Sequence, residues 1–434
     1  MPQIKNALVQ EWDELVAQIP DDLEVSAKEK GALCRRREIK SADDLLRLLL
    51  IYGITLSLRM TAIWGVGLGI CDVSRQDLQR RVHRSLPWLY HLLAVLMSTT
   101  FELPQTGKEL IKRVLLRDAS AIARPGSPGT EWRLHLNWCP FGLRPAQVTL
   151  TDDHTGEGLE DAGLQAGDLV IADRAYGIWR AVREALAAAA YFIIRLPWSN
   201  FPFRTLAGEA FDLIAWLRNI PASQAYAETT VIAADDPQLR PLRLIAGRIP
   251  DDKAETARER VRRQARKKKR QPHPNTLLAA GFCIVVTNLP AAVWPALTVL
   301  AFYRVRWQIE WCFRRWKSLC HLDKLPAYPA QIAEAVLVAK LIIILLMQKR
   351  CGVLPWQDWW VDQAPPPTVS PVMSMVYQRI CNIIRPTKIV DQVLENPQPF
   401  MRHLRSSHRK RTLQLADAAC RLAALLPGLI PVPP

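Results

Sequence analysis

Apolar residues recur every three or four positions through the N-terminal part of the chain. The pattern is clear in residues 41–58 and again in 86–97, and it is typical of helices that bury one face. Ser41 followed by Asp44 indicates a helix start, because the Ser hydroxyl accepts from a free backbone N–H and the acid lies in the first turn. We therefore expect residues 1–105 to form a helical domain.

Within this part, residues 58–84 predict two short helices around a glycine-rich turn. A helix from about Leu58 runs into three glycines between positions 65 and 69, and Ser74 then caps a second helix. That second helix carries the cations Arg75, Arg80, Arg81 and Arg84. A helix, a glycine turn and a basic helix form the order of a DNA-binding helix-turn-helix. The alternative is two packed helices whose basic face only meets water.

From about Lys112 the periodicity changes to that of strands. β-rich or alternating runs at 112–122, 131–139 and 144–153 are separated by turn residues, which predicts a three-strand meander. A short helix near Gly156–Gly163, a buried strand in GDLVIADRAYG, an alanine-rich helix and a strand in YFIIRLP follow. Three antiparallel strands followed by helices alternating with strands are the order of a ribonuclease H-like α/β core.

Residues 200–280 interrupt that order. They hold a short amphipathic helix, two β-rich runs and the segment Arg258–Arg270, which has nine cations and one acid. Strand returns only in FCIVVTNLP, so the core is split by a β-rich insertion. The basic run suits contact with DNA phosphates. The alternative for it is a solvated, partly disordered segment.

The resulting organisation has five parts. After residue 326 the chain is helical again, with a proline-rich linker at 363–371 and a basic segment at 401–411. The expected parts are a helical DNA-binding domain (1–105), a first core segment (106–199), the insertion with the basic run (200–280), a second core segment (281–326) and a helical region with possible dimerisation (327–434).

Composition narrows the class of partner. Lys and Arg number 57 against 41 Asp and Glu, giving a net charge of +16, which indicates a polyanion such as nucleic acid or an anionic membrane. The longest apolar runs, Leu48–Leu58 and Leu341–Met347, are shorter than the ~20 residues of a membrane span, and the N-terminus lacks a signal-peptide pattern. Nine scattered cysteines without a CxxC pair favour reduced thiols in a cytoplasmic protein.

The run YRVRWQIEWCFRRWKSL surrounds one carboxylate, Glu310, with cations and tryptophans. On a helix, Tyr303, Arg306, Glu310 and Lys317 fall within roughly 60° of one another, with Arg314 beside them. The opposite side of that helix is apolar and fits a core: Val305, Ile309, Cys312, Trp316 and Cys320. The simple alternative is that Arg306 and Glu310 form an ordinary i,i+4 pair on a solvated face.

Two aspartates at strand ends change that balance. Asp118 lies in VLLRDAS and Asp173 ends the apolar strand LVIAD. A carboxylate beside an apolar strand is costly unless it is paired or binds a cation. Two such aspartates and a helix Glu are the ligands of two-metal phosphoryl chemistry. The alternative for Asp173 is a bridge to Arg174 or Arg117.

These residues resemble a known family. Tyr303-x2-Arg306-x3-Glu310-x6-Lys317 matches the Y-R-E-K signature of the insertion sequence four family of DDE transposases, which cut and paste DNA. LLRDAS and LVIADRAYG look like the first and second aspartate motifs of that family, and the β-rich insertion occupies the same place. The resemblance covers Lys112–Lys317, and RHLRSSHRKR resembles a C-terminal basic motif of many members.

The resemblance implies roles for these residues. Asp118, Asp173 and Glu310 would be the catalytic ligands of Mg²⁺, with Mn²⁺ able to substitute. Arg306 and Lys317 would contact phosphates, and Tyr303 would help to place the terminal phosphate. The complete set expected to bind DNA is Tyr303, Arg306, Lys317, Arg314, Arg266, Lys267, Lys268, Lys269, Arg75 and Arg80. Members often capture a flipped base on an aromatic side chain, but we expect Trp307 and Trp311 to pack against the insertion.

The expected function is therefore a DNA transposase on the nucleoid. It would bind terminal inverted repeats, cleave the transposon ends and join them to target DNA, in many members through a hairpin. Because both ends are cut together, we expect a homodimer on two ends, formed through the C-terminal helices. The alternatives are an inactive, transposase-derived DNA-binding protein and a metal-dependent nuclease of the same fold.

Overall fold

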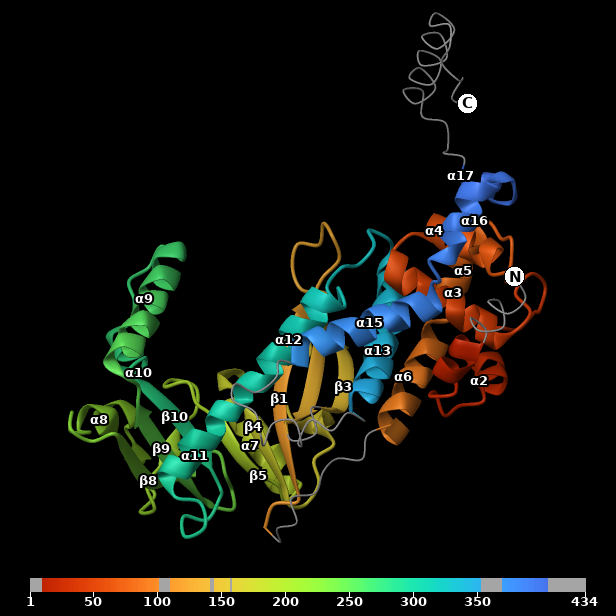
Figure 1. The fold of residues 1–434 in the computed structure, drawn as a ribbon. Helices are drawn as coiled ribbons and strands as arrows, with labels where there is room; N and C mark the ends of the chain where they lie inside the picture. The colour runs from red at the N-terminus through yellow and green to blue at the C-terminus, as the bar shows by residue number, and fades with distance from the viewer. Residues whose placement is uncertain (1–9, 101–109, 141–143, 157, 353–368, 405–434) are drawn as a thin grey trace, which may run out of the picture.

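A single mixed sheet runs through the middle of the molecule (Figure 1). The computed structural model describes residues 10–100, 110–140, 144–156, 158–352 and 369–404. Within these ranges the sheet has ten strands in the order β3-β2-β1-β4-β5-β10-β9-β8-β6-β7. Most of the helices at the two ends of the chain gather beside the β3 end, so the protein is mixed α/β, as the sequence predicts.

The first half of the sheet begins with the predicted meander. β1 pairs antiparallel with β2, and β2 pairs antiparallel with β3. β4 then pairs parallel with β1, and β5 parallel with β4. Parallel pairing brings the carboxyl ends of neighbouring strands to one edge of a sheet. The bounds are β1 (Arg113–Ile122), β2 (Trp132–Cys139), β3 (Arg144–Asp152), β4 (Asp168–Ala172) and β5 (Tyr191–Arg195).

The strands of the predicted insertion continue the same sheet. β10 pairs antiparallel with β5 on one side and with β9 on the other, and β8 pairs with β9. The insertion is thus joined to the core by main-chain hydrogen bonds. The bounds are β6 (Phe203–Arg204), β7 (Ala210–Phe211), β8 (Tyr226–Ala233), β9 (Pro241–Arg248) and β10 (Phe282–Thr287).

The basic run of the insertion is an ordered helix. Residues 251–267 form α9, which rises from the β10 and α10 end of the molecule, away from the chain ends (Figure 1). The alternative of a partly disordered segment is therefore wrong for these residues. Helix α9 spans Asp251–Lys267. The other helices of this half are α7 (Trp179–Ala187), α8 (Leu213–Arg218), α10 (Pro274–Ala279), α11 (Ala296–Tyr303) and α12 (Trp307–Leu319). Short 3-10 turns lie at Glu160–Ala162, Arg174–Tyr176 and Arg304–Arg306.

The N-terminal helices begin where their caps predict. The Ser41 hydroxyl accepts from the backbone N–H of Asp44 at 3.0 Å, and Ser74 accepts in the same way from Asp77 at 3.1 Å. The helix, turn and basic helix of residues 58–84 are present, with Gly69 at φ +73° in the turn. The bounds are α2 (Leu23–Glu29), α3 (Ala42–Thr55), α4 (Leu58–Gly67), α5 (Arg75–Arg84) and α6 (Leu86–Thr100).

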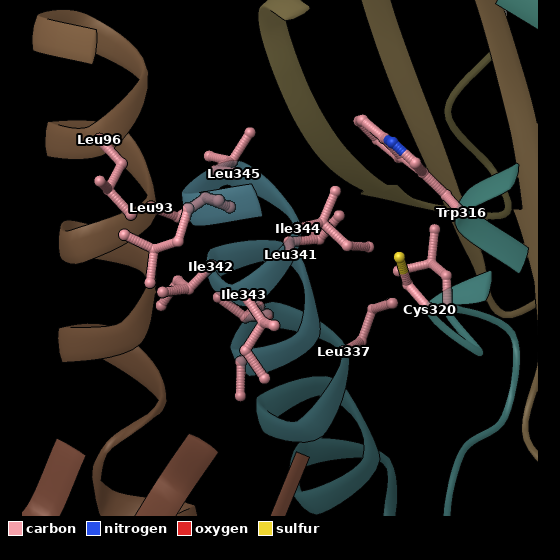
Figure 2. Close-up of a cluster of buried hydrophobic side chains, with 14 of the residues drawn as sticks. Leu93, Leu96, Trp316, Cys320, Leu337, Leu341, Ile342, Ile343, Ile344 and Leu345 are labelled. Carbon is pink, nitrogen blue, oxygen red and sulfur yellow. The ribbon is translucent and has the colours of Figure 1, made fainter. Parts of the chain in front are cut away.

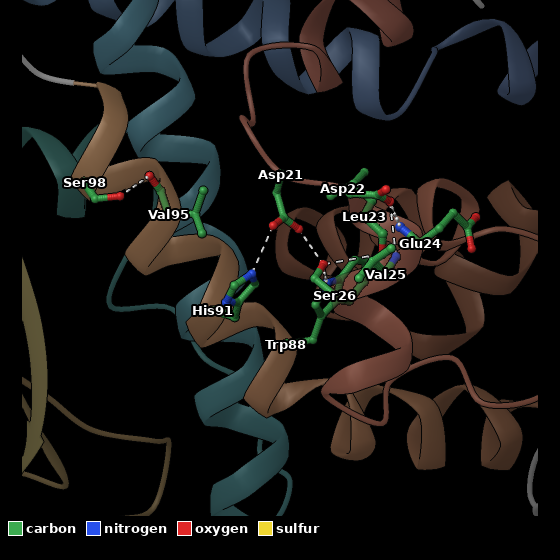
Figure 3. A network of polar contacts seen from close by, with 10 residues as sticks. All are labelled: Asp21, Asp22, Leu23, Glu24, Val25, Ser26, Trp88, His91, Val95 and Ser98. Carbon is green, nitrogen blue, oxygen red and sulfur yellow. Dashed lines mark hydrogen bonds and ion pairs between the residues drawn. The ribbon is translucent and has the colours of Figure 1, made fainter.

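A buried polar network holds α2 against α6 (Figure 3). The Ser26 hydroxyl accepts from Nε1 of the fully buried Trp88 at 2.8 Å and donates to Asp21. The other carboxylate oxygen of Asp21 lies 3.1 Å from Nε2 of His91. Because each buried polar atom in this chain of contacts has a partner, the network adds little desolvation cost and fixes the position of α2.

Helix α13 (Ala330–Gly352) is the centre of the helical half. It packs against α3, α6 and α15 (Val369–Ile384). Figure 2 shows Leu93 of α6 on one side of α13 and Trp316 of α12 on the other. Arg47 of α3 also donates to the carbonyls at the end of α15, Ile383 and Ile384. The first and last parts of the chain therefore share one core, which α12 connects to the sheet.

Helix α13 also has the length and the apolar composition of a membrane-spanning helix. Residues Ala330–Cys351 are long and apolar enough to cross a membrane, by length and composition alone. Counting unbroken apolar runs missed them, because Glu334 and Lys340 interrupt the run. Most of the helix is buried inside the protein, as expected for a core helix.

The end of the chain is only partly described. Short helices follow α15, namely α16 (Lys388–Glu395), a 3-10 turn at Gln398–Phe400 and α17 (Met401–Leu404). Most of the proline-rich linker predicted at 363–371, and residues 405–411 of the basic segment, lie outside the described residues.

Candidate active site

Two strands place Asp118 and Asp173 side by side. In the parallel pair of β1 and β4, Arg117 stands opposite Ala172, so the next residue on each strand is an aspartate at the same level. All five residues of β4 are buried, and all except Asp168 are apolar, which fixes the position of the strand within the sheet. Asp173 then turns the chain, accepting from the backbone N–H of Ala175 at 2.8 Å. Neighbouring strands lie about 4.8 Å apart, so the two carboxylates share one edge of the core.

Arg306 connects this pair to Glu310. Helix α12 contacts β1, and the Nη2 atom of Arg306 lies 2.5 Å from Oε1 of Glu310. Its Nη1 atom lies 3.8 Å from Oδ2 of Asp118. The three predicted carboxylates thus converge on one region, with a buried guanidinium between two of them.

The electrostatics of this region disfavour a charged Asp118. Burial raises the pKa of Asp118 to about 7, and the nearby charge of Asp173 adds to that effect. Glu310 acts in the same direction, whereas the Ala119 N–H and Arg306 oppose it. A carboxyl group held near pKa 7 among other carboxylates is a group that a bound cation would ionise.

The donor chemistry of the three residues fits a hard divalent cation. Carboxylate oxygens are the ligands that Mg²⁺ and related ions prefer, and the crowding that raises the pKa of Asp118 would be relieved by such an ion. As the side chains stand, no three His, Cys, Asp or Glu side chains of the described residues are grouped to hold one ion. Arg306 instead provides the positive charge beside Asp118 and Glu310.

The single helix predicted from Tyr303 to Leu319 is broken. Tyr303 ends α11, a 3-10 turn spans Arg304–Arg306, and α12 begins at Trp307. Tyr303 and Arg306 are consequently not on a solvated face, since they are only 7% and 6% exposed. The apolar face is as predicted, with Ile309, Cys312, Trp316 and Cys320 buried and Val305 partly buried.

Tyr303 lies under the arginine of the site. The Arg306 guanidinium carbon is 5.9 Å from the centre of the Tyr303 ring, and burial raises the pKa of the phenol to about 12. The phenol oxygen is buried and makes no hydrogen bond to any described residue. A buried hydroxyl without a partner costs free energy, so this atom is one to which a ligand could bond.

Lys317 and Arg314 lie farther along α12. Lys317 Nζ donates to the carbonyl of Ala121 at 3.2 Å, three residues beyond Asp118 on β1. Arg314 is exposed, with its guanidinium carbon 4.9 Å from the centre of the Trp311 ring. Trp307 and Trp311 are 56% and 50% exposed. The prediction that both pack against the insertion is therefore wrong, because α12 turns these side chains to solvent.

The structural alternative for Asp173 is contradicted. Arg117 donates to the Asn137 side chain at 3.2 Å and to the Gly158 carbonyl at 3.3 Å. Within the described ranges, neither Arg117 nor Arg174 forms an ion pair with Asp173. Asp173 thus lies at the edge of the core without a paired cation.

The remaining residues predicted to bind DNA are not near these carboxylates. Arg75 and Arg80 are exposed on α5, where Arg80 lies 3.4 Å from Asp77. The exposed cations Arg266, Lys267, Lys268 and Lys269 lie at the C-terminal end of α9. Figure 1 shows α5 and α9 at opposite ends of the molecule, so these residues belong to separate surfaces.

Sequence reasoning missed Arg195 at the same edge and considered Arg174 only as an ion-pair partner of Asp173. In the pair of β4 and β5, Ile194 stands opposite Ala172, which brings Arg195 level with Asp173. Arg174 follows Asp173 directly. Partial burial, and then the charge of Arg195, lower the pKa of Arg174. The available signal was an arginine at the end of β5 and another one residue beyond Asp173, and the search for carboxylates passed over it.

Comparison with known proteins decides the family. Residues 98–346 match the family described as the transposase DDE domain. The putative transposase InsL of insertion sequence element IS186A from Escherichia coli is 34% identical over 345 residues, which are 77% of this chain and 92% of that protein. The chain belongs to the DDE transposase family.

Other relatives agree with that assignment. The transposase of insertion sequence element IS421 from Escherichia coli is 34% identical to this transposase over 346 residues, again 77% of this chain and 92% of that protein. The transposase of IS231F from Bacillus thuringiensis subsp. israelensis is 24% identical over 75% of this chain and 76% of that protein. The resemblance to the insertion sequence four family is confirmed, and the protein is an enzyme of DNA strand cleavage and transfer.

One solved structure has a distant likeness to the transposase. It is the piggyBac transposase in a synaptic complex with hairpin DNA, with a TM-score of 0.46 and 9% identity over 96% of this chain and 85% of that chain. A likeness at that level is too weak to support a conclusion about this fold.

Proposed function

We propose that this transposase binds the terminal inverted repeats of its element, cleaves the ends and joins them to target DNA with Asp118, Asp173 and Glu310 as catalytic residues. The observation that carries the proposal is the register of β1 and β4. It sets the two aspartates side by side, while Arg306 links Asp118 to Glu310. Its DNA substrate would place the reaction on the nucleoid in the cytoplasm.

The three carboxylates would hold Mg²⁺, with Mn²⁺ able to substitute. Such ions would lower the pKa of the attacking water or hydroxyl and would stabilise the leaving oxygen. Two features of this chain support that proposal. The three side chains are carboxylates, whose oxygens accept hydrogen bonds and can bind metal, and the pKa of Asp118 is raised. Arg306 would then have its charge free for DNA, because ions would take its place beside the carboxylates.

The cations and the phenol around Glu310 would position the DNA. Lys317 makes one hydrogen bond, to Ala121, and an ammonium group has three donors, so two remain for a phosphate. Arg306 is planar and suits bidentate contact with phosphate oxygens. The free phenol of Tyr303 would donate to the terminal phosphate.

The core would be ribonuclease H-like. Support comes from the run β3-β2-β1-β4-β5, in which three antiparallel strands precede two parallel ones. The five-part organisation is proposed on the same basis, with the insertion extending the sheet through the pairing of its β9 with β10 of the second core segment. The helix-turn-helix of α4 and α5 would recognise the repeats through Arg75 and Arg80, and the end of α9 would hold flanking DNA.

The working form would be a homodimer on two DNA ends, because both ends must be cut together. The C-terminal helices carry exposed apolar side chains, among them Met375 on α15 and Leu394 on α16. Exposed large apolar side chains are candidates for an interface. Sedimentation with and without DNA tests this form, and a monomer on paired ends would contradict it.

The test of the catalytic assignment uses labelled DNA carrying the inverted repeats of the element, with Mg²⁺. Wild-type protein should cleave the ends, and Asp118→Asn, Asp173→Asn and Glu310→Gln should each abolish cleavage while still binding DNA. The exposed Asp235→Asn is the control. Undiminished cleavage by the three variants would contradict the site. Binding without cleavage by the wild type would favour the inactive DNA-binding protein, and cleavage without joining would favour the nuclease.

A further inference from the structure

A groove lies between helix α9 and the edge of the sheet. It has a volume of about 680 Å³. Arg174 and Arg195 line it on the side of the sheet, and Arg260 and Arg270 line it on the side of α9 and the segment after it. Arg174 and Arg195 are also the two arginines beside Asp173. The groove therefore runs from the edge that carries the aspartates toward the basic helix.

The charged side chains that line this groove are all positive. No Asp or Glu is among its lining residues. Within the described part of the chain, none of the four arginines makes a side-chain hydrogen bond or ion pair. Their neighbours on α9 differ, since Arg258 and Arg262 are paired with Glu255 at 3.2 Å and 2.6 Å. The acids of α9 thus neutralise one part of the helix and leave the groove unneutralised.

Four guanidinium groups with no carboxylate among the lining residues favour an anionic ligand with several acceptor groups. Guanidinium is always charged and makes bidentate bonds to phosphate oxygens. Like charges held close together repel one another, and Arg174 and Arg195 line the same side of the groove. A ligand with consecutive phosphates would relieve that repulsion along the whole groove.

We propose that this groove holds the sugar-phosphate backbone of one DNA strand next to the bond that is cleaved. The inference rests on the proposed catalytic role of Asp118 and Asp173. The groove volume is within the ~300–1,000 Å³ of sites that enclose small ligands, so it has room for a short stretch of single strand and not for a duplex. Arg195 and Arg174 contact the phosphates nearest to the aspartates, and Arg260 and Arg270 contact those farther along.

Binding measurements without divalent metal test the groove independently of cleavage. The probes are two fluorescent duplexes of the same inverted-repeat sequence, one blunt and one with a single-stranded extension. Wild-type protein should bind the extended duplex more tightly and with a steeper dependence on salt. The double variant Arg260→Gln, Arg270→Gln changes two exposed positions. It should weaken the extra affinity for the extended duplex by roughly tenfold or more, and it should lower the slope of the logarithm of the binding constant against the logarithm of the salt concentration by about 1.4. Arg195→Gln should act similarly, with partial recovery in Arg195→Lys.

Matched variants separate the groove from general loss of charge. Arg183→Gln on α7 and Arg204→Gln on β6 remove exposed arginines outside the groove and should keep the gain. Arg263→Gln lies on α9 but outside the groove and should lose less than Arg260→Gln. Equal losses for Arg263→Gln and Arg260→Gln, or no gain from the extension in the wild type, would overturn the proposal.

The same experiment distinguishes the two levels of inference. The wild type could bind and cleave its ends while the groove variants still bind the extended duplex normally. That result would contradict the proposed role of the groove and would leave the catalytic assignment intact. If Asp118→Asn cleaves like the wild type, the catalytic assignment fails, and the path of the strand must be assigned anew. Adding inorganic pyrophosphate as a competitor shows whether the groove takes any polyphosphate, and loss of the extension-dependent gain only at high pyrophosphate supports DNA as the ligand.

Discussion

The side chain of Arg306 is hydrogen-bonded to Glu310, one helical turn later, at 2.5 Å. The same guanidinium lies 3.8 Å from Asp118 on the neighbouring strand. In the metal-free protein, one arginine thus offsets the mutual repulsion of two of the carboxylates that we propose as catalytic. This relationship gives the predictions on stability that follow.

Arg306→Ala should destabilise the metal-free protein. Removal of one partner of a largely buried ion pair leaves uncompensated charge, and Glu310 is partly exposed, so we expect a loss of about 2 kcal/mol in the free energy of unfolding. Urea denaturation measures it. The control is Arg314→Ala, which removes an exposed arginine from the following helix, α12, and should change stability by less than about 0.5 kcal/mol. Equal effects of both substitutions would contradict a special role for Arg306.

Asp118 predicts an unusual dependence of stability on pH. Its folded-state pKa is raised from 3.8 to about 7, so between those values the folded state binds more protons than the unfolded state. The stability of the metal-free protein should therefore fall as pH rises from about 4 to about 7. Asp118→Asn should remove this loss and be more stable above pH 7, by up to about 4 kcal/mol.

Thermal melting between pH 4 and pH 8 measures that difference. The control is Asp152→Asn, because hydrogen bonds from Thr155 lower the pKa of Asp152. The carboxylate of Asp152 therefore stabilises the folded protein above the unfolded-state pKa, and this contribution is lost as pH falls through the folded-state pKa. The change of stability with pH is thus opposite in sign to that of Asp118. A constant gap between Asp118→Asn and the wild type at every pH would argue against the raised pKa.

Mg²⁺ should raise the melting temperature of the wild type at pH 8. A ligand that binds only the folded state stabilises it by about 2.7 kcal/mol at a concentration one hundred times its Kd. Asp173→Asn should lose most of this gain, because Asp173 stands level with Asp118 and forms no ion pair with any described residue. The exposed Asp235→Asn should keep it. An equal Mg²⁺ response in Asp173→Asn would show that the ion binds elsewhere.

Lys317→Ala should reduce end cleavage or joining without loss of metal binding. Its ammonium is anchored on the Ala121 carbonyl and would contact phosphate, and one charge-assisted contact contributes on the order of tenfold in rate or affinity. Cleavage of labelled ends and the Mg²⁺-dependent melting shift are measured on the same preparation. Lys324→Ala, an exposed lysine in the loop after α12, serves as the control. A lost melting shift in Lys317→Ala would place this lysine in the metal site instead.

Local patterns were sufficient for most of the elements of this fold. Alternating or β-rich runs predicted β1 to β5 and β8 to β10, but not the two-residue strands β6 and β7, and side-chain capping by Ser41 and Ser74 predicted two helix starts. These features depend on neighbours within a few residues, because a cap or an alternating face is made by the segment itself. The spacing from Tyr303 to Lys317 likewise carried the family resemblance, which the relatives confirm.

Other features depended on partners far away in the chain. The pattern of residues 303–319 showed an apolar face, but it did not show the 3-10 turn at Arg304–Arg306 that buries Tyr303 and Arg306. It also did not show that Trp307 and Trp311 face solvent. Periodicity reports which side of an element is apolar, whereas the segment that covers each side is chosen by packing.

The sequence by itself determined most of the strands and helices, the family and the three carboxylates as candidates. Only the tertiary structure decided that Asp118 on β1, Asp173 directly after β4 and Arg195 at the end of β5 stand level. It also decided that the insertion joins the same sheet and that a basic groove begins beside them. The physical reason is that strand register is set by hydrogen bonds between segments many residues apart, and a shift of one residue would turn every side chain to the other face.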